Sequence, residues 1–190
     1  MNKSDGSMGP DGWTVYLASL DIDSTLEAVE SAGGSVLMPS MKVGDFGTMA
    51  MVTDPSGATV GIWQAGEHRG FGLKDEPGAP TWFELTAKNY DATVEFYRSA
   101  FGWQTKALTD YPEMNYTVLV DGDTQLAGIM DASQMSPEPD RSSWSVYFGV
   151  SDVDSTISTA VENGGTLVEE PKDTPYGRLA GLADPTGALF

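Results

Sequence analysis

The side chains that could carry chemistry in this 190-residue sequence are mainly carboxylates, because it contains no cysteine and a single histidine, His68. The lack of cysteine excludes disulfides, thiolate nucleophiles and cysteine-ligated metals, and one histidine excludes sites built from several imidazoles. Glu84 stands out because it follows Trp82 by two residues within a strand predicted over 81–86. Side chains two residues apart on a strand share a face, so Glu84 lies beside an indole as a candidate general base or carboxylate ligand.

The other titratable residues fit structural roles. Asp21 and Asp152 stand just before predicted helices, where a side-chain oxygen caps free backbone amides, and Asn89 takes the same place before a third helix. His68 lies in the glycine-rich stretch AGEHRGFG and is interpreted as a solvated loop residue. No G-x-G-x-x-G, G-x-x-x-x-G-K-[ST] or G-x-S-x-G sequence occurs, so NAD, ATP and a Ser-His-Asp triad are not expected.

The charge balance argues against two classes of partner. The chain has 28 acidic and 10 basic residues, for a net charge of -18. A nucleic-acid backbone or an anionic membrane surface would be repelled, so neither is expected as a partner. The first ten residues have no apolar core, and no apolar run approaches the roughly 20 residues of a membrane span. A cytoplasmic location is therefore expected.

The sequence contains an internal repeat. Residues 13–36 and 144–167 share nine of 24 aligned residues (Trp, Val, Tyr, Asp, Asp, Ser, Thr, Gly and Gly). An Asp-Pro-Ser/Thr-Gly-Ala segment follows each copy, at 54–58 and 184–188. These stretches are therefore predicted to be two copies of one structural unit.

Each copy is predicted to be a βαβββ unit. In the first, alternation from Trp13 to Leu17 indicates a strand, and the helix that follows ends at Gly33-Gly34. Three short strands come next, with the Asp-Pro-Ser-Gly turn between the last two. A third stretch has the same order of elements with different residues. The predicted fold class is α+β, with tandem units at 13–64, 81–131 and 144–190 and Gly-, Pro-, Ser- and charge-rich linkers at 65–80 and 132–143.

These features resemble the vicinal oxygen chelate superfamily, which contains glyoxalase I, bleomycin-resistance proteins and extradiol dioxygenases. The resemblance rests on the alternation of a YDATVEFYRSAFGW helix unit with a DVDST…GG unit that closes on Asp-Pro-x-Gly-Ala, and it covers nearly the whole chain. In particular, the chain looks like tandem glyoxalase-like proteins with four such units. The resemblance implies that two units pair into a cup-shaped mixed sheet with helices outside and the ligand inside.

The same resemblance implies a domain organisation. Residues 81–190 would form one complete glyoxalase-like domain, and 13–64 would be an orphan unit, the second half of a first domain. The chain is interpreted as a truncated form or fragment of a four-unit protein, or as one whose units pair between chains. An unpaired sheet leaves an apolar face and an open edge in water, so a homodimer through 13–64 is predicted.

The resemblance also implies where a metal would bind. Metal-dependent members take ligands, usually His, from the first strand of each unit and a Glu from the last strand. The corresponding first-strand residues are Thr14, Trp82 and Ser145, and Gly61 takes the place of the glutamate in the first unit. Such residues are poor ligands or none, so no metal ligand and no cofactor are predicted, with a divalent cation as the alternative.

Strand parity and the implied cup together predict a ligand site. The predicted lining is Trp82, Glu84, Tyr116, Ser145, Tyr147, Tyr176 and Arg178. Aromatic walls with a carboxylate, a guanidinium and phenol hydroxyls suit a flat, partly polar organic molecule. The alternative is that these aromatics fill the cup and leave no cavity. The nine methionines are scattered and are interpreted as core filler.

Three functions stay open at this point. The first is a metal-free protein that binds a small, partly aromatic molecule, as bleomycin-resistance proteins sequester drugs. The second is a lyase, isomerase or dioxygenase-type enzyme of the same superfamily, with Glu84 as a carboxylate base or with a degenerate metal site. The third is an inactive fragment or an interaction module. Loss of the ligand residues favours the first and third over the second.

Overall fold

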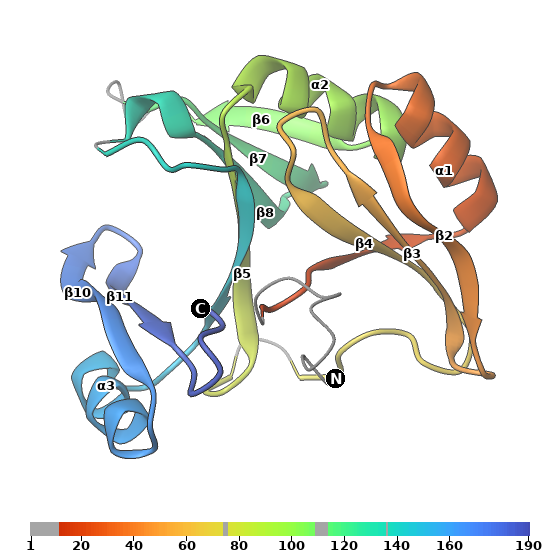
Figure 1. Cartoon of the computed structure of the whole chain (residues 1–190). Coiled ribbons are helices and arrows are strands. Elements are labelled where there is room, and N and C mark those ends of the chain that lie inside the picture. Colours follow the sequence, from red (N-terminus) through yellow and green to blue (C-terminus); the bar gives the residue numbers. More distant parts are fainter. Residues whose placement is uncertain (1–11, 74–75, 109–113, 136) are drawn as a thin grey trace. The chain divides into compact units, whose positions relative to one another are not determined.

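The protein is described by a computed structural model that covers residues 12–73, 76–108, 114–135 and 137–190 (Figure 1). We call residues 13–65 module one, 80–131 module two and 143–190 module three, each one residue longer than predicted. Module one contains β1 (Tyr16–Ser19), α1 (Ile22–Ser31), β2 (Ser35–Val43), β3 (Gly47–Thr53) and β4 (Thr59–Ala65). Module two contains β5 (Pro80–Ala87), α2 (Tyr90–Phe101), β6 (Gln104–Leu108), β7 (Tyr116–Asp121) and β8 (Thr124–Asp131). The predicted α+β class and the βαβββ order of both modules are confirmed.

Module three follows the same order of elements up to its third strand. After a 3-10 turn, η2 (Ala132–Gln134), it contains β9 (Ser143–Phe148), α3 (Val153–Glu162), β10 (Thr166–Thr174) and β11 (Gly177–Ala183). Where modules one and two have a fourth strand, the structure has a single bridge between Ala183 and Leu189.

Each complete module places its first strand parallel to its last. The sheet of module one has the order β1-β4-β3-β2, and β1 is parallel to β4. The sheet of module two has the order β6-β7-β8-β5, with β5 parallel to β8, and β9 follows β5 as a fifth strand. Strands β10 and β11 form a separate antiparallel pair. In module one the helix joins β1 to β2, which lie at opposite edges of the sheet, so it crosses from one edge to the other.

The sequence-predicted helix caps are confirmed at two of three positions. Asp21 accepts a hydrogen bond from the Ser24 amide at 3.1 Å, and Asp152 accepts one from the Ser155 amide at 2.8 Å. Asn89 is the N-cap of α2 by position, but its side chain makes no capping bond. The predicted strand at Trp13–Leu17 is shifted, because the parallel ladder with β4 begins at Tyr16.

The chain divides into two compact units. The larger contains Thr14–Gly72 and Trp82–Val146, and the smaller contains Leu73–Thr81 and Tyr147–Phe190. In the larger unit, α1 and α2 lie side by side, and modules one and two share one hydrophobic core (Figure 1). Its largest fully buried side chains include Phe96, Tyr97, Ile62, Leu85 and Ile129. The pairing of modules two and three into one domain stays a sequence-based prediction.

A buried polar network crosses the core of the larger unit. The Tyr97 hydroxyl on α2 donates to Asp54 Oδ2 at 3.0 Å and accepts from the Trp144 indole at 3.1 Å. Asp54 Oδ1 accepts from the Ser56 amide, the Ser56 hydroxyl and the Ala58 amide in the Asp-Pro-Ser-Gly turn. Burial nevertheless raises the pKa of Asp54 above its ordinary value. The network ties the module one turn to α2 and β9.

Within the part of the chain that the structure describes, no helix is both long and apolar enough to cross a membrane.

Removing the Tyr97 hydroxyl should destabilise the larger unit. Tyr97→Phe leaves Asp54 Oδ2 and the Trp144 indole without a partner in a buried site, which costs about 2 kcal/mol of unfolding free energy. Urea unfolding followed by tryptophan fluorescence measures the loss. Leu20→Ala, at a fully exposed position, is the control and should change stability by less than about 0.5 kcal/mol. Equal stability of the two variants would show that the network contributes nothing.

Asp54 and Asp184, which occupy the same position in the repeated turn, should contribute to stability with opposite pH dependence. Because the folded pKa of Asp54 is raised, its stabilising contribution is present at low pH and is lost as the pH rises through that pKa. Hydrogen bonds from Thr186 and the Ala188 amide lower the pKa of Asp184 in the corresponding module three turn, so its contribution is lost as the pH falls. Relative to wild type, Asp54→Asn should therefore gain stability with rising pH, and Asp184→Asn should lose it. Urea titrations across pH 3 to 7 measure both, and slopes of the same sign would contradict the assignment.

Candidate functional site

Three of the predicted site residues form one hydrogen-bonded chain. The Trp82 indole on β5 donates to the Tyr116 hydroxyl at 3.0 Å, and that hydroxyl donates to Glu84 Oε2 at 2.7 Å. Tyr116 belongs to β7, and β8 lies between β7 and β5, so its ring crosses β8 to reach Glu84. The core contains Leu85, so the alternation along β5 puts Trp82 and Glu84 on the sheet face opposite the helices. The predicted grouping of these three residues is thus found in the structure, and their role stays a prediction.

A glycine makes this crossing possible. Gly128 on β8 pairs with Glu84, and a Cβ at Gly128 would collide with the hydroxyl and ring of Tyr116. Module one reaches a similar result without a crossing, because Gly61 pairs directly with Tyr16 and a Cβ there would collide with the Tyr16 ring. In both modules a tyrosine ring thus covers the space that a side chain on the last strand would need.

Gly128 is a site residue that the sequence analysis missed, although a signal was present. Gly61 follows Asp54 by seven residues, and Gly128 follows Asp121 of the module two hairpin by the same interval. The two glycines also have matching partners on the first strand of each module. Gly128 therefore stands where the family resemblance implies a metal-binding glutamate.

The residues on this face do not fit a divalent metal. The Trp82 indole nitrogen carries a proton and donates it to Tyr116, so it offers no lone pair to an ion. Gly128 offers no side chain, and Tyr116 fills the space above it. Among the described residues, no three His, Asp or Glu side chains are grouped so that they could hold a metal. Glu84 alone would make at best a weak cation site.

Ser145 lies on the same sheet face as Glu84. Its neighbours in β9, Trp144 and Val146, point the other way, because Trp144 bonds Tyr97 in the core and Val146 is buried. Strand β9 lies next to β5 in the sheet. Alternation therefore puts the Ser145 hydroxyl on the face that carries Trp82 and Glu84.

The remaining predicted lining residues belong to the smaller unit. Tyr147 is half-buried in β9, and Tyr176 is exposed at the turn between β10 and β11. The Arg178 guanidinium is paired within its own module, with Asp154 and Asp173 at 3.0 and 3.1 Å. The hydrogen bonds that the guanidinium donates to Asp154, and next the one to Asp173, raise the pKa of Arg178. The participation of these three residues in the site stays a prediction.

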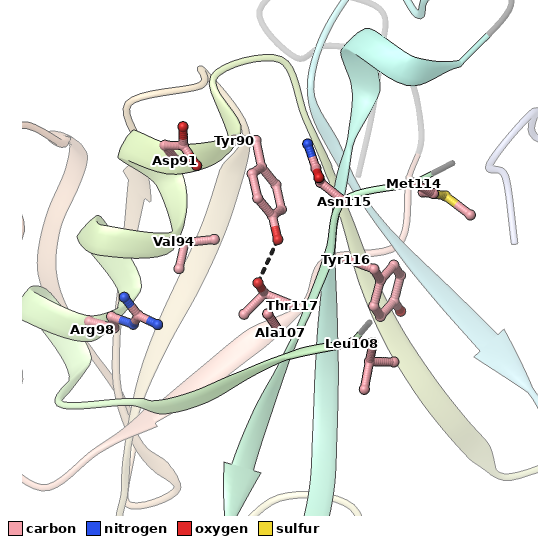
Figure 2. A pocket seen from close by; sticks show the side chains of 10 residues that line it. All are labelled: Tyr90, Asp91, Val94, Arg98, Ala107, Leu108, Met114, Asn115, Tyr116 and Thr117. Atoms are coloured by element: carbon pink, nitrogen blue, oxygen red, sulfur yellow. Dashed lines mark hydrogen bonds between the residues drawn. The ribbon is translucent and has the colours of Figure 1, made fainter. Parts of the chain in front are cut away.

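A cavity of about 610 Å³ lies on the opposite, helix-covered face of the module two sheet (Figure 2). The Tyr90 hydroxyl points across it from α2 to the Thr117 hydroxyl on β7, and burial raises the pKa of Tyr90. Tyr116, the next residue on β7, directs its hydroxyl to Glu84. The full lining is Tyr90, Asp91, Val94, Arg98, Ala107, Leu108, Met114, Asn115, Tyr116 and Thr117. Sequence periodicity did not predict this cavity. Periodicity indicates which face of a helix or strand is buried, but not how closely a helix packs on a sheet.

One interpretation from the sequence is wrong for part of the molecule. In β3, Ala50 and Val52 are fully buried, so the alternating Met49 and Met51 lie on the other face of the module one sheet. Met49 pairs with Trp63 of β4, and Met51 pairs with Gly61. These methionines are not core filler, because they form a sheet surface together with Tyr16 and Trp63.

Comparisons with known proteins assign the family. The sequence profile of the Glyoxalase/Bleomycin resistance protein/Dioxygenase superfamily matches residues 80–190. The Mycobacterium tuberculosis protein CFP32, named as a glyoxylase, is 40% identical over 182 residues, which are 95% of this chain and 69% of CFP32. The chain belongs to this superfamily. The predicted resemblance is thereby confirmed.

Other superfamily proteins are also similar to this chain. The anthracycline biosynthesis protein DnrV of Streptomyces peucetius is 39% identical over 178 residues, which cover 94% of this chain and 64% of DnrV. The Mn(II)-bound glyoxalase of Novosphingobium aromaticivorans matches 92% of this chain and 60% of its own, with a TM-score of 0.57 and 18% identity, and so shares the fold. This superfamily chain therefore spans about two thirds of the length of each of these relatives.

A side chain at position 128 should displace Tyr116. Gly128→Ala puts a methyl group where the Tyr116 hydroxyl lies, and overpacking of this kind costs about 1 to 3 kcal/mol of unfolding free energy. The cost should disappear when Tyr116→Ala removes the ring first, so a double-mutant cycle by urea unfolding gives a coupling energy of similar size. Gly72→Ala, at a position with open space around it, is the control. Additive effects of the two substitutions would show that Tyr116 does not occupy this space.

Proposed function

We propose that this superfamily member binds a small, partly aromatic organic molecule on the sheet face of module two, without a metal ion. The observation that carries the proposal is the Trp82–Tyr116–Glu84 hydrogen-bond chain. This chain lies at the positions where the resemblance implies metal ligands. An indole, a phenol and a carboxylate would therefore contact the ligand there, in place of a metal ion.

The chemistry of these groups selects a class of ligand. An ionised Glu84 accepts hydrogen bonds and donates none, so it favours a ligand hydroxyl or amine. Trp82 and Tyr116 are flat aromatic side chains and favour a planar ring. The net charge of -18 disfavours anions. A planar, neutral or cationic molecule with a hydroxyl or amine donor fits all three conditions. The name of the relative DnrV, an anthracycline biosynthesis protein, supports a polycyclic aromatic ligand of this kind.

Binding measurements on three variants test the proposal. An anthracycline, catechol and benzoate are titrated into the wild-type chain by isothermal calorimetry, and the first two are expected to bind in preference to the anion. Glu84→Gln removes a charge-assisted hydrogen bond and should weaken binding about tenfold or more. Trp82→Ala and Tyr116→Phe should weaken it as well. Glu95→Gln, on the exposed surface of α2, is the matched control and should leave the affinity unchanged.

The outcomes separate the three candidate functions. Binding that is insensitive to all three substitutions, or no binding, would reject this site and leave an interaction module or inactive fragment. Consumption of the aromatic ligand by wild type but not by Glu84→Gln would favour the enzyme, in which Glu84 acts as a base. That alternative rests on the Glu84 carboxylate, which the hydrogen bond from the Tyr116 hydroxyl at 2.7 Å holds in place.

Metal independence has its own test. Dialysis against EDTA, and addition of Mn²⁺, Ni²⁺ or Zn²⁺, should leave the melting temperature and the ligand affinity unchanged, because Gly128 and Trp82 supply no ligand. Elemental analysis checks the purified chain. A stoichiometric ion, or a melting temperature that rises with one of these metals, would overturn this part of the proposal.

We also propose that module one pairs with its counterpart in a second copy of the chain. Its sheet face carries Tyr16, Trp63, Met49 and Met51, and Leu37 and Met41 of β2 are exposed. Apolar surface of this kind favours association. Sedimentation velocity should show a dimer at micromolar concentration, and Met51→Glu should shift it to monomer. A wild-type chain that sediments strictly as a monomer would refute the pairing.

A further inference from the structure

Module one carries four methionines on the sheet face opposite its core. Met38 and Met41 belong to β2, and Met49 and Met51 belong to β3. The register pairs Met38 with Met51 and Met41 with Met49. Directly paired side chains of an antiparallel ladder share a face, with their Cβ atoms about 4.5–5.5 Å apart. Because alternation along β3 turns its two methionines away from the core, all four lie on one surface, which we call the methionine cluster.

Irregularities in β2 bring the cluster together. In a regular strand, Met38 and Met41 would point to opposite faces, because they are three residues apart. The register of β2 shifts between Val36 and Met38 and again between Met38 and Met41. Bulges of this kind re-aim side chains, and here they place both methionines of β2 beside those of β3. Met41 is 49% exposed on this edge strand, so solvent reaches the cluster from the β2 side.

Two aromatic rings border the methionine cluster. On β4, Trp63 pairs with Met49 and Gly61 pairs with Met51. The Tyr16 ring occupies the space above Gly61, and its centroid lies 6.3 Å from that of Trp63. The face of an indole or phenol ring attracts a cation that is held beside it. A positive ion bound by the methionines of β3 would therefore have aromatic neighbours on the β4 side.

The donor atoms of the cluster select a class of ion. Thioether sulfur is a soft, neutral ligand and favours Cu(I), whereas Mn²⁺, Mg²⁺ and Ca²⁺ favour oxygen. The sequence contains no cysteine, so methionine supplies its softest ligands. Neutral ligands do not offset the charge of a divalent ion, which favours a monovalent one. The net charge of -18 adds an attraction for any cation.

We propose that the methionine cluster binds a single Cu(I) ion through its thioether sulfurs. Met49 and Met51 are about 7 Å apart along β3. The unbranched methionine side chain has three rotatable bonds, so sulfurs from both cross-strand pairs can converge on one ion. The inference does not depend on the ligand proposed for module two. It shares its surface with the proposed pairing of module one, and leucine substitutions keep that surface apolar, so the ion and the pairing are tested separately.

Calorimetric titration with Ag(I), a redox-stable probe for Cu(I), tests the proposal, because the chain has no cysteine that would bind the ion first. One ion per chain is expected. Met49→Leu combined with Met51→Leu should weaken binding about tenfold or more, because leucine conserves the volume but removes two sulfurs. Competition with a Cu(I) chelator under anaerobic conditions should rank the variants in the same order. Met135→Leu, at an exposed methionine outside the cluster, is the matched control and should leave the affinity unchanged.

Methyl-labelled methionine gives a second readout by NMR. The methyl signals of the cluster should shift with Ag(I), and that of Met135 should not. Unchanged affinity of the double variant, or an equal loss in Met135→Leu, would overturn the proposal. So would Zn²⁺ that binds as tightly as Ag(I). His68→Ala should keep the affinity, and a loss as large as that of the double variant would assign the ion to the imidazole beside Trp63 instead.

Elemental analysis of copper adds an independent check. Copper that the purified wild-type chain retains and the double variant lacks belongs to module one, and it leaves the proposed metal-free site of module two unaffected. Copper retained equally by both proteins would contradict the assignment to the methionine cluster.

Discussion

The buried carboxylate of Asp54 is the constraint on which the larger unit depends. A carboxylate inside a core is tolerated only when its oxygens are hydrogen bonded, and here the partners come from three places: its own turn, Tyr97 of α2 and, through Tyr97, Trp144 of β9. These hydrogen bonds can form only when module one, α2 and β9 are all in position. The network therefore holds the turn between β3 and β4 against α2 and ties α2 to β9, which lies beside β5 in the sheet whose face carries Trp82, Glu84 and Ser145.

Gly128 on that face, and Gly61 in the sheet of module one, limit what chemistry is available there. Gly128 and Gly61 each give their space to a tyrosine ring, so the side chain that would carry a metal-binding carboxylate is replaced by a phenol from another strand. In module two the phenol connects an indole to a carboxylate. A metal site attracts ligand oxygens through charge, whereas the proposed site, with neutral donors and one anion, would select by hydrogen-bond direction and ring shape. The binding mode that we propose thus differs from metal chelation within the same superfamily fold.

Much of this arrangement follows from sequence, and the exceptions have physical reasons. The repeat and the turn chemistry predicted the βαβββ order and both aspartate caps, because these are local effects. Period-two alternation grouped Trp82, Glu84 and Tyr116. Alternation could not show that Met49 and Met51 face outward, since which side of a sheet is buried depends on what packs there. Nor could it separate Asp54 from Asp184, whose turns differ only by Ser56 against Thr186, although among the described residues only Asp54 accepts a hydrogen bond from a distant helix.

The shared core of modules one and two has a consequence for how the molecule comes apart. Residues of α1, β3, β4, α2, β5 and β8 belong to one continuous cluster, so neither module can open without exposing the apolar surface of the other. Residues 14–72 and 82–146 should thus melt in a single cooperative step, although two βαβββ modules make them up. Residues 147–190, whose helix buries no side chain, are free to follow their own transition. Most of the second copy of the internal repeat, 144–167, therefore lies in a different cooperative unit from the first copy, 13–36.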